Sequence, residues 1–247
     1  MRVRSVVAAA LVLAAAAITL PARAGAQASD PLADGLVPGD YLRVGASSIV
    51  PISPSGSLKD WSRGVGFGVV WENWDTGRGG VGRVGYGFMV DYSLLPFDDK
   101  QFLSEFTPLS GQALTASASK AGVFQAGVDV RIRIPAPFIM PSVSLSFGFL
   151  DWHPGQIKYT TTTSPSVTQT AKQQHRSGGL VSIGGGLDKH IYDRWAIFGE
   201  AVYTYGYTSF GQGLAGSGSQ CLTSGCDLLK NTPLGTIRGG LRVRVSK

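Results

Sequence analysis

A two-residue alternation of apolar and polar side chains is the feature that most constrains the fold of this chain. Between residues 83 and 92, every even position is Val, Tyr or Phe, whereas the odd positions are Arg, Gly, Met and Asp. Residues 124–134 repeat the pattern, with Asp129, Arg131 and Arg133 on the polar side. A period of two is typical of a β-strand with one apolar face.

Six further segments show the same alternation with varying clarity, so we expect eight strands. They are residues 42–46, 65–72, 142–149, 181–188, 195–207 and 237–245. The sequence therefore predicts an all-β protein, an eight-stranded antiparallel up-and-down barrel.

The first residues have the pattern of a secretory signal peptide. Arg2 and Arg4 precede an apolar run over residues 6–20, and the small-residue sequence Ala26-Gln27-Ala28 follows. The run is shorter than the roughly 20 residues of a membrane-spanning helix. We expect cleavage after Ala28, so that residues 1–28 are the signal peptide and residues 29–247 form one barrel domain.

Charge and cysteine content exclude some classes of protein. The formal charge of +6 includes Arg2, Arg4 and Arg23 of the predicted signal, and the small excess that remains does not indicate a nucleic-acid-binding protein. Cys221 and Cys226 lie close together in a Gly/Ser-rich segment of an exported chain, so we expect a disulfide between them. No further His or Cys lies between Gly211 and Thr236, so we expect no metal site there, and no cofactor.

Connection lengths distinguish a membrane barrel from a soluble barrel that turns its apolar face inward around a ligand. Connections over residues 51–63, 93–120, 152–176 and 208–234 are long, whereas those over 75–82, 135–141 and 190–194 are short. Long loops outside and short periplasmic turns are typical of outer-membrane barrels. Aromatic residues at strand ends are expected to form two girdles at the membrane interfaces, namely Trp71, Trp74, Tyr92, Trp152, Trp195, Tyr205 and Tyr207.

With this export signal, strand number, alternation and loop asymmetry, the chain resembles the small outer-membrane β-barrel families: the membrane domain of OmpA-type proteins, and OmpX and OmpW-like, porin-like barrels. The resemblance implies a location in the cell outer membrane of a Gram-negative bacterium and a monomer. Its implied partners are outer-membrane lipid, lipopolysaccharide and the barrel-assembly machinery. The expected function is a structural, surface-contact or narrow-pore role without catalytic activity.

Charged residues on the polar faces are expected to point into the lumen and to pair there, mostly in its periplasmic half. An alternative is a narrow ion path lined by arginine. The predicted inward set is Arg43, Arg83, Arg131, Arg133, Arg238, Arg242 and Arg244, with Glu72, Asp91, Asp129, Asp188 and Glu200.

The long loops contain candidate contact residues. Trp61, Phe97, Phe102 and Phe106 are expected to face the outside. The Thr/Ser-rich residues 160–170 either contribute to surface contact or extend a strand hairpin beyond the membrane.

An enzymatic alternative rests on His175-Arg176-Ser177. Lipid A deacylases of the outer membrane use a His-x-Ser pair on a lipid-facing strand, and Asp151 falls on the outward face of another strand. A carboxylate, a histidine and a serine are the parts of a hydrolase triad. A soluble periplasmic ligand carrier of lipocalin type is the third alternative.

Overall fold

The structure is a computed structural model. It describes residues 38–52, 60–74, 83–105, 114–134, 136, 139–161, 168–171, 175–192, 194–207 and 232–245. The predicted signal peptide, Phe106 and the predicted Cys221–Cys226 disulfide lie outside these residues.

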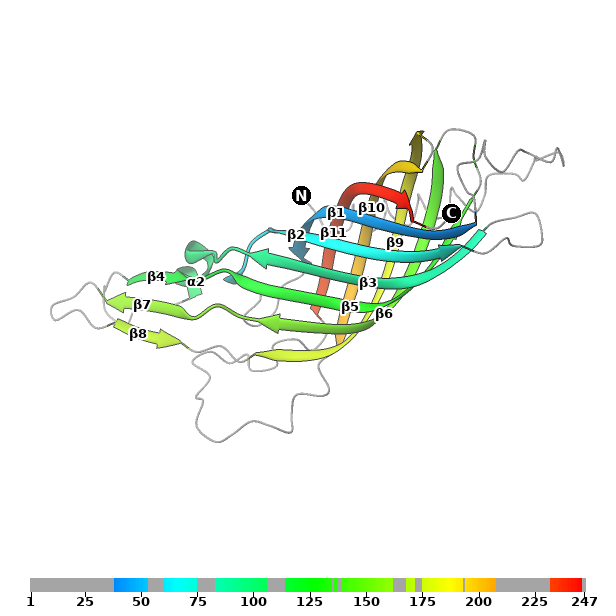
Figure 1. The fold of residues 1–247 in the computed structure, drawn as a ribbon. Helices are drawn as coiled ribbons and strands as arrows, with labels where there is room; N and C mark the ends of the chain where they lie inside the picture. The colour runs from blue at the N-terminus through cyan, green and yellow to red at the C-terminus, as the bar shows by residue number, and fades with distance from the viewer. Residues whose placement is uncertain are drawn as a thin grey trace.

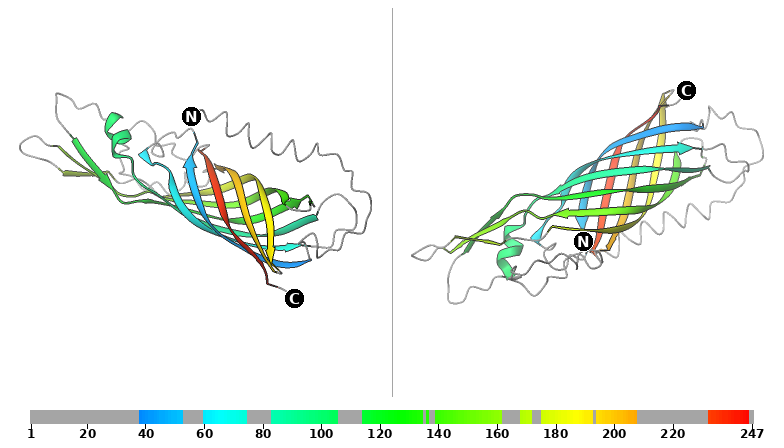
Figure 2. Two further views of the ribbon diagram at one scale, coloured as in Figure 1. Left: turned by 90° about the horizontal axis from the view of Figure 1, so that it is seen from above. Right: turned by 60° about the horizontal axis from the view of Figure 1, so that its bottom comes forward.

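Eight antiparallel strands form a closed barrel, which confirms the predicted fold class (Figures 1 and 2). Their order around the barrel is β1-β11-β10-β9-β6-β5-β3-β2. The first and last strands close it, with pairing that runs from Tyr41 opposite Arg244 to Pro51 opposite Leu234. The strands are β1 (Gly39–Pro51), β2 (Gly64–Trp74), β3 (Arg83–Leu95), β5 (Ala121–Arg133), β6 (Met140–His153), β9 (Arg176–Tyr192), β10 (Trp195–Tyr207) and β11 (Thr232–Arg244).

The two ends of the barrel differ in the length of their connections. At one end β5 is followed closely by β6, and β9 by β10. We call this the turn end. At the opposite end, the loop end, long segments lead from β1 to β2, β3 to β5, β6 to β9 and β10 to β11. This asymmetry is the one expected for an outer-membrane barrel, with the loop end outside.

The apolar faces of the strands point outward. Val65, Phe88 and Ile237 are each more than 60% exposed. An apolar surface of this extent is stable against lipid and not against water. The orientation is opposite to the one that a soluble ligand carrier requires. Other large apolar side chains of this surface include Phe67, Val84, Tyr86, Val90, Tyr92, Val128, Ile132, Phe147, Phe149, Ile183, Trp195 and Leu241.

A second, three-stranded sheet projects beyond the barrel at the loop end (Figure 1). Its strands, in the order β4-β7-β8, are β4 (Leu114–Ala118), β7 (Ile157–Thr161) and β8 (Thr168–Ala171). A short helix, α2 (Asp99–Glu105), lies beside β4 (Figure 2). No helix among the described residues is long and apolar enough to cross a membrane.

Of the Thr/Ser-rich residues 160–170, the described ones lie in β7 and β8, which pair antiparallel with Thr160 opposite Thr168, whereas residues 162–167 lie outside the described residues. The prediction that Trp61 and Phe102 face the outside is wrong, and Phe97 is half-buried. Trp61 is 2% exposed and its ring packs edge-on against Phe97 and Trp152, at centroid distances of 5.4 and 6.1 Å. Phe102 is buried against Ile157 and Tyr159 of β7. These aromatic side chains pack together at the base of the projecting sheet. Burying them removes from water the apolar area that they would expose in a solvated loop.

Candidate functional site

The turn-side half of the lumen contains a network of buried ion pairs. Arg43 lies at its centre, with its guanidinium nitrogens 3.4 Å from Glu72, 3.3 Å from Asp188 and 3.3 Å from Glu200. All four side chains are at most 2% exposed. An eight-stranded barrel has an interior just wide enough for its own side chains, so each buried charge needs its partner within the lumen.

Two further arginines complete this layer. Arg131 is 2.7 Å from Glu200 and 3.2 Å from Glu72. Arg133 is 2.9 Å from Asp188 and 3.0 Å from Glu72. Each of these carboxylates therefore contacts at least two arginines, so the network fixes the lumen as one unit and leaves no single pair isolated.

Arg238 and Asp91 extend the network toward the loop end. Arg238 donates to Asp91 at 2.7 Å and to Glu200 at 2.8 Å. Gly68 makes room for this contact, because a Cβ atom on it would lie 2.5 Å from Asp91 Oδ2 and 3.2 Å from Arg238 Nε.

The remaining predicted lumen residues are placed as follows. Asp129 lies 3.4 Å from Arg131 and accepts a hydrogen bond from Ser146, and Arg242 lies 3.7 Å from Asp188. Arg244 is half-buried at the end of β11. The side chain of Arg83 is not among those that the structure describes.

Three arginines of the lumen also stack on aromatic rings that the sequence did not assign to it. The guanidinium carbon lies 4.1 Å from the ring centroid of Phe198 for Arg43, 3.9 Å from Trp74 for Arg133 and 4.8 Å from Tyr41 for Arg242. An aromatic face attracts a cation, most strongly away from water.

The prediction that Trp74 and Trp152 belong to interfacial girdles is therefore wrong, since each is 2% exposed and faces inward. Trp74 also donates from Nε1 to Glu72 at 3.0 Å. The charged lumen therefore supplies an acceptor for the indole N–H. The girdle prediction rested only on the position of these tryptophans at strand ends.

The loop-side half of the lumen contains apolar side chains together with buried uncharged polar ones, such as Gln125, Ser182 and Thr204. Inward-facing residues of the strands form one hydrophobic cluster there, and Trp61 and Trp152 belong to it. An ion that passes these apolar side chains loses hydration there, which is costly. The cluster consists of Ile49, Trp61, Val70, Met89, Leu95, Ala121, Val123, Leu150, Trp152, Leu180 and Leu234.

On the outer wall near the loop end, the structure brings together Asp151, His153 and His175. His175 Nε2 lies 2.5 Å from Asp151 Oδ1, and His153 Nδ1 lies 2.8 Å from Asp151 Oδ2. The two imidazole rings are 4.0 Å apart between centroids. We call these three residues the rim cluster.

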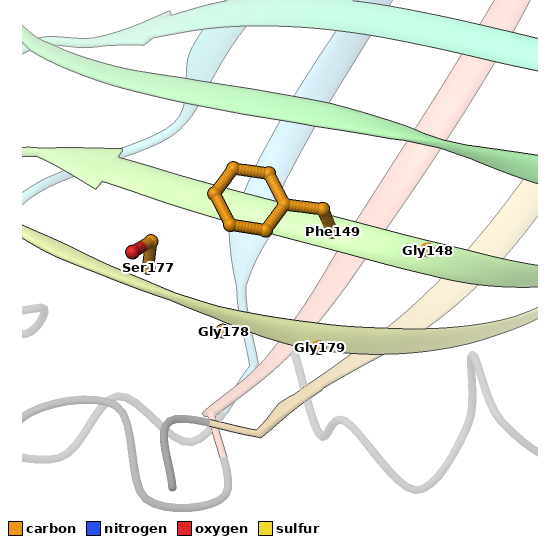
Figure 3. Close-up of a pocket in the computed structure, with 5 residues that line it drawn as sticks. All are labelled: Gly148, Phe149, Ser177, Gly178 and Gly179. Carbon is orange, nitrogen blue, oxygen red and sulfur yellow. The ribbon is translucent and has the colours of Figure 1, made fainter. Parts of the chain in front are cut away.

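Ser177 lies next to the rim cluster. It is directly opposite Asp151 in the β6–β9 pairing, and it lines a shallow pocket of about 270 Å³ together with Phe149 and three glycines (Figure 3). His175 is engaged with Asp151 through Nε2, and no hydrogen bond joins it to Ser177 among the described residues. Of the two hydrogen bonds that a triad requires, the one between histidine and carboxylate is therefore formed, and the one between serine and histidine is not.

Comparison with known proteins gives architectural neighbours only. No family model and no curated protein matches the chain. The chain is similar to solved small outer-membrane barrels. Neisserial surface protein A shows 12% identity over 83% of this chain and 97% of that one, with a TM-score of 0.40. Ail, the attachment invasion locus protein of Yersinia pestis, shows 13% identity over 84% and 99%, with a TM-score of 0.42.

The N-terminal barrel domain of Pseudomonas aeruginosa OprF shows 10% identity over 83% of this chain and 99% of that one, with a TM-score of 0.37.

Proposed function

We propose that the protein is exported to the outer membrane and makes surface contacts there through the projecting sheet, with the barrel as a closed anchor. The observation that carries the proposal is the continuity between sheet and barrel. Phe97 and Ala118 pack against both the loop-side cluster of the lumen and the cluster of Phe102, Ile157 and Tyr159 beneath the sheet. The sheet is thereby held rigidly beyond the rim, where a partner outside the cell meets it.

The projecting sheet has one apolar and one polar face. Tyr159 and Ile157 of β7 are buried, whereas Lys158 between them is exposed. Lys158 pairs with Ser117 on one side and Thr170 on the other, so the ammonium group has hydroxyl-bearing neighbours on both adjacent strands. Thr115, Thr160 and Thr168 form the next row. We call these six residues the polar face; they offer hydrogen-bond donors and one positive charge to a polar partner.

A pore is the less supported role. Ion-paired side chains and a cluster of buried apolar side chains fill the lumen, and ion conduction requires sites that an ion both enters and leaves readily. The proposed partners in the membrane are lipid and lipopolysaccharide, which contact the outward apolar surface, and the machinery that inserts barrels.

Attachment of cells that display the protein tests the surface-contact role. We expect these cells to bind polysaccharide-coated surfaces better than cells without it, and Lys158→Glu to abolish the gain. Lys189→Glu is the matched control, because Lys189 is also exposed but lies near the turn end of β9. Equal attachment of cells with and without the wild-type protein contradicts the proposal.

A second candidate function, hydrolysis of an acyl chain of outer-leaflet lipid, is favoured by one observation. Asp151 holds His175 on the outward face, and Ser177 lies beside a pocket on that same face. In this scheme Ser177 is the nucleophile, His175 the base and Asp151 the orienting carboxylate. Mass spectrometry of lipid A from cells with wild-type protein or Ser177→Ala tests it; identical lipid A excludes it.

A further inference from the structure

We propose that the rim cluster is a binding site for a divalent transition-metal ion, with Zn²⁺ as the ion of best fit. One carboxylate oxygen and one imidazole nitrogen from each histidine all lie within 4.8 Å of one another. Donors bound to one tetrahedral zinc ion at about 2.0–2.2 Å lie about 3–4 Å apart, so small side-chain rotations bring these atoms to their positions.

The backbone fixes the two strands that supply these ligands. β6 and β9 pair continuously up to Trp152 opposite Arg176, and continuing the register by one residue sets His153 opposite His175. Asp151 lies two residues before His153, on the same outward face of β6. The three ligands therefore converge without any rearrangement of the main chain.

The chemistry of the donor set selects the class of ion. Two imidazoles with one carboxylate suit zinc, copper, nickel and iron, whereas magnesium and calcium prefer oxygen ligands alone. Three protein ligands leave a fourth position for water. The side chains of His153 and His175 are 65% and 52% exposed, so an ion reaches the cluster from solvent.

The existing contacts also favour a cation between these groups. The Asp151 carboxylate spans both histidines, one on each oxygen. The nitrogens that now face the carboxylate donate their N–H to it. A metal ion would take the place of these protons and bind the nitrogen lone pairs that they leave, and the carboxylate adds the negative charge that a divalent ion requires. A bound ion would join the loop ends of β6 and β9 at the base of the β7–β8 hairpin.

Isothermal titration of the folded, tag-free protein in detergent with ZnCl₂ tests the site. We expect one Zn²⁺ per chain, with affinity reduced at least tenfold by His153→Ala, by His175→Ala and by Asp151→Asn. His190→Ala is the matched control, because His190 is the third histidine of the chain and lies near the turn end of β9. This variant should bind as the wild type does.

Cobalt substitution gives a second readout that is independent of affinity. Co²⁺ in the wild-type protein should show the visible absorption of a tetrahedral or five-coordinate site, and His153→Ala should remove it. Ser177→Ala should bind Zn²⁺ normally, which separates this inference from the lipid-hydrolase candidate. Zinc binding that is absent from the wild type, or unchanged in both histidine variants, overturns the proposal.

Discussion

Arg43 lies over the ring of Phe198 inside the barrel, with 4.1 Å between the guanidinium carbon and the ring centroid. Phe198 falls on the face of β10 that also carries Glu200 and Thr204, so a large aromatic residue there interrupts the polar pattern. The stacking explains the exception. The ring covers one face of a guanidinium whose edges contact three carboxylates.

Replacement of Phe198 by leucine should therefore destabilise the barrel more than the same replacement at a lipid-facing position. A desolvated cation–π contact contributes about 2 kcal/mol. We expect Phe198→Leu to lower the free energy of unfolding by about that much more than Phe147→Leu does, since Phe147 is 48% exposed on the outer face of the barrel. Urea unfolding of both variants in liposomes measures the difference, and equal losses contradict the proposed contact.

Removal of the charge of Glu200 should be among the most damaging isosteric changes. Glu200 contacts Arg43, Arg131 and Arg238, all buried, and loss of one partner of a buried ion pair costs about 3–5 kcal/mol. Glu200→Gln should lower the free energy of unfolding by an amount in this range. Asp99→Asn, an exposed change on α2, is the control and should alter stability by less than about 0.5 kcal/mol. A small effect of Glu200→Gln means that the network does not stabilise the lumen.

A methyl group at Gly68 should disturb the Arg238–Asp91 pair. The added Cβ would lie 2.5 Å from Asp91 Oδ2, so the carboxylate must move. We expect Gly68→Ala to cost about 1–3 kcal/mol, the usual penalty of overpacking. Gly199→Ala is the matched control, because nothing lies within 4 Å of its Cβ position. If both variants unfold at the same urea concentration, the expected clash between the new Cβ atom and the Asp91 carboxylate does not occur.

The closed lumen should show no stepwise conductance. Wild-type protein inserted in planar bilayers is expected to leave the current at baseline, since Leu150, Leu180 and Leu234 are buried in one apolar cluster at the loop end of the lumen. Protease protection of the same protein preparation in lipid vesicles shows whether the protein has inserted. Reproducible single-channel steps from protein that passes this check favour the pore instead.

The barrel was predictable from the sequence because the two-residue period is local and reports directly which side chains face one way. The inward position of the aromatic residues of the lumen could not be predicted in this way. Trp74 has the residue type of a membrane girdle, and only the position of Arg133 over its ring shows why it lies inside. Alternation separates two faces but does not tell which aromatic residues have a cation opposite them.

The projecting sheet and the apolar cluster inside the lumen could not be predicted either, because their members lie far apart along the chain. Ala116 of β4 pairs with Tyr159 of β7, across a separation that no local pattern reports. Leu180 and Leu234 lie just outside the segments in which the alternation was recognised. The sequence did indicate Asp151, His175 and Ser177 as one group, but the register that sets Asp151 opposite Ser177 comes only from the structure.

Cell fractionation combined with gel migration of boiled and unboiled samples tests the central claim most directly. We expect the protein to fractionate with the outer membrane and the unboiled form to migrate differently, because the closed barrel resists detergent until heated. A protein found soluble in the periplasm, with the same migration before and after boiling, contradicts the outward orientation of the apolar faces and with it the whole account.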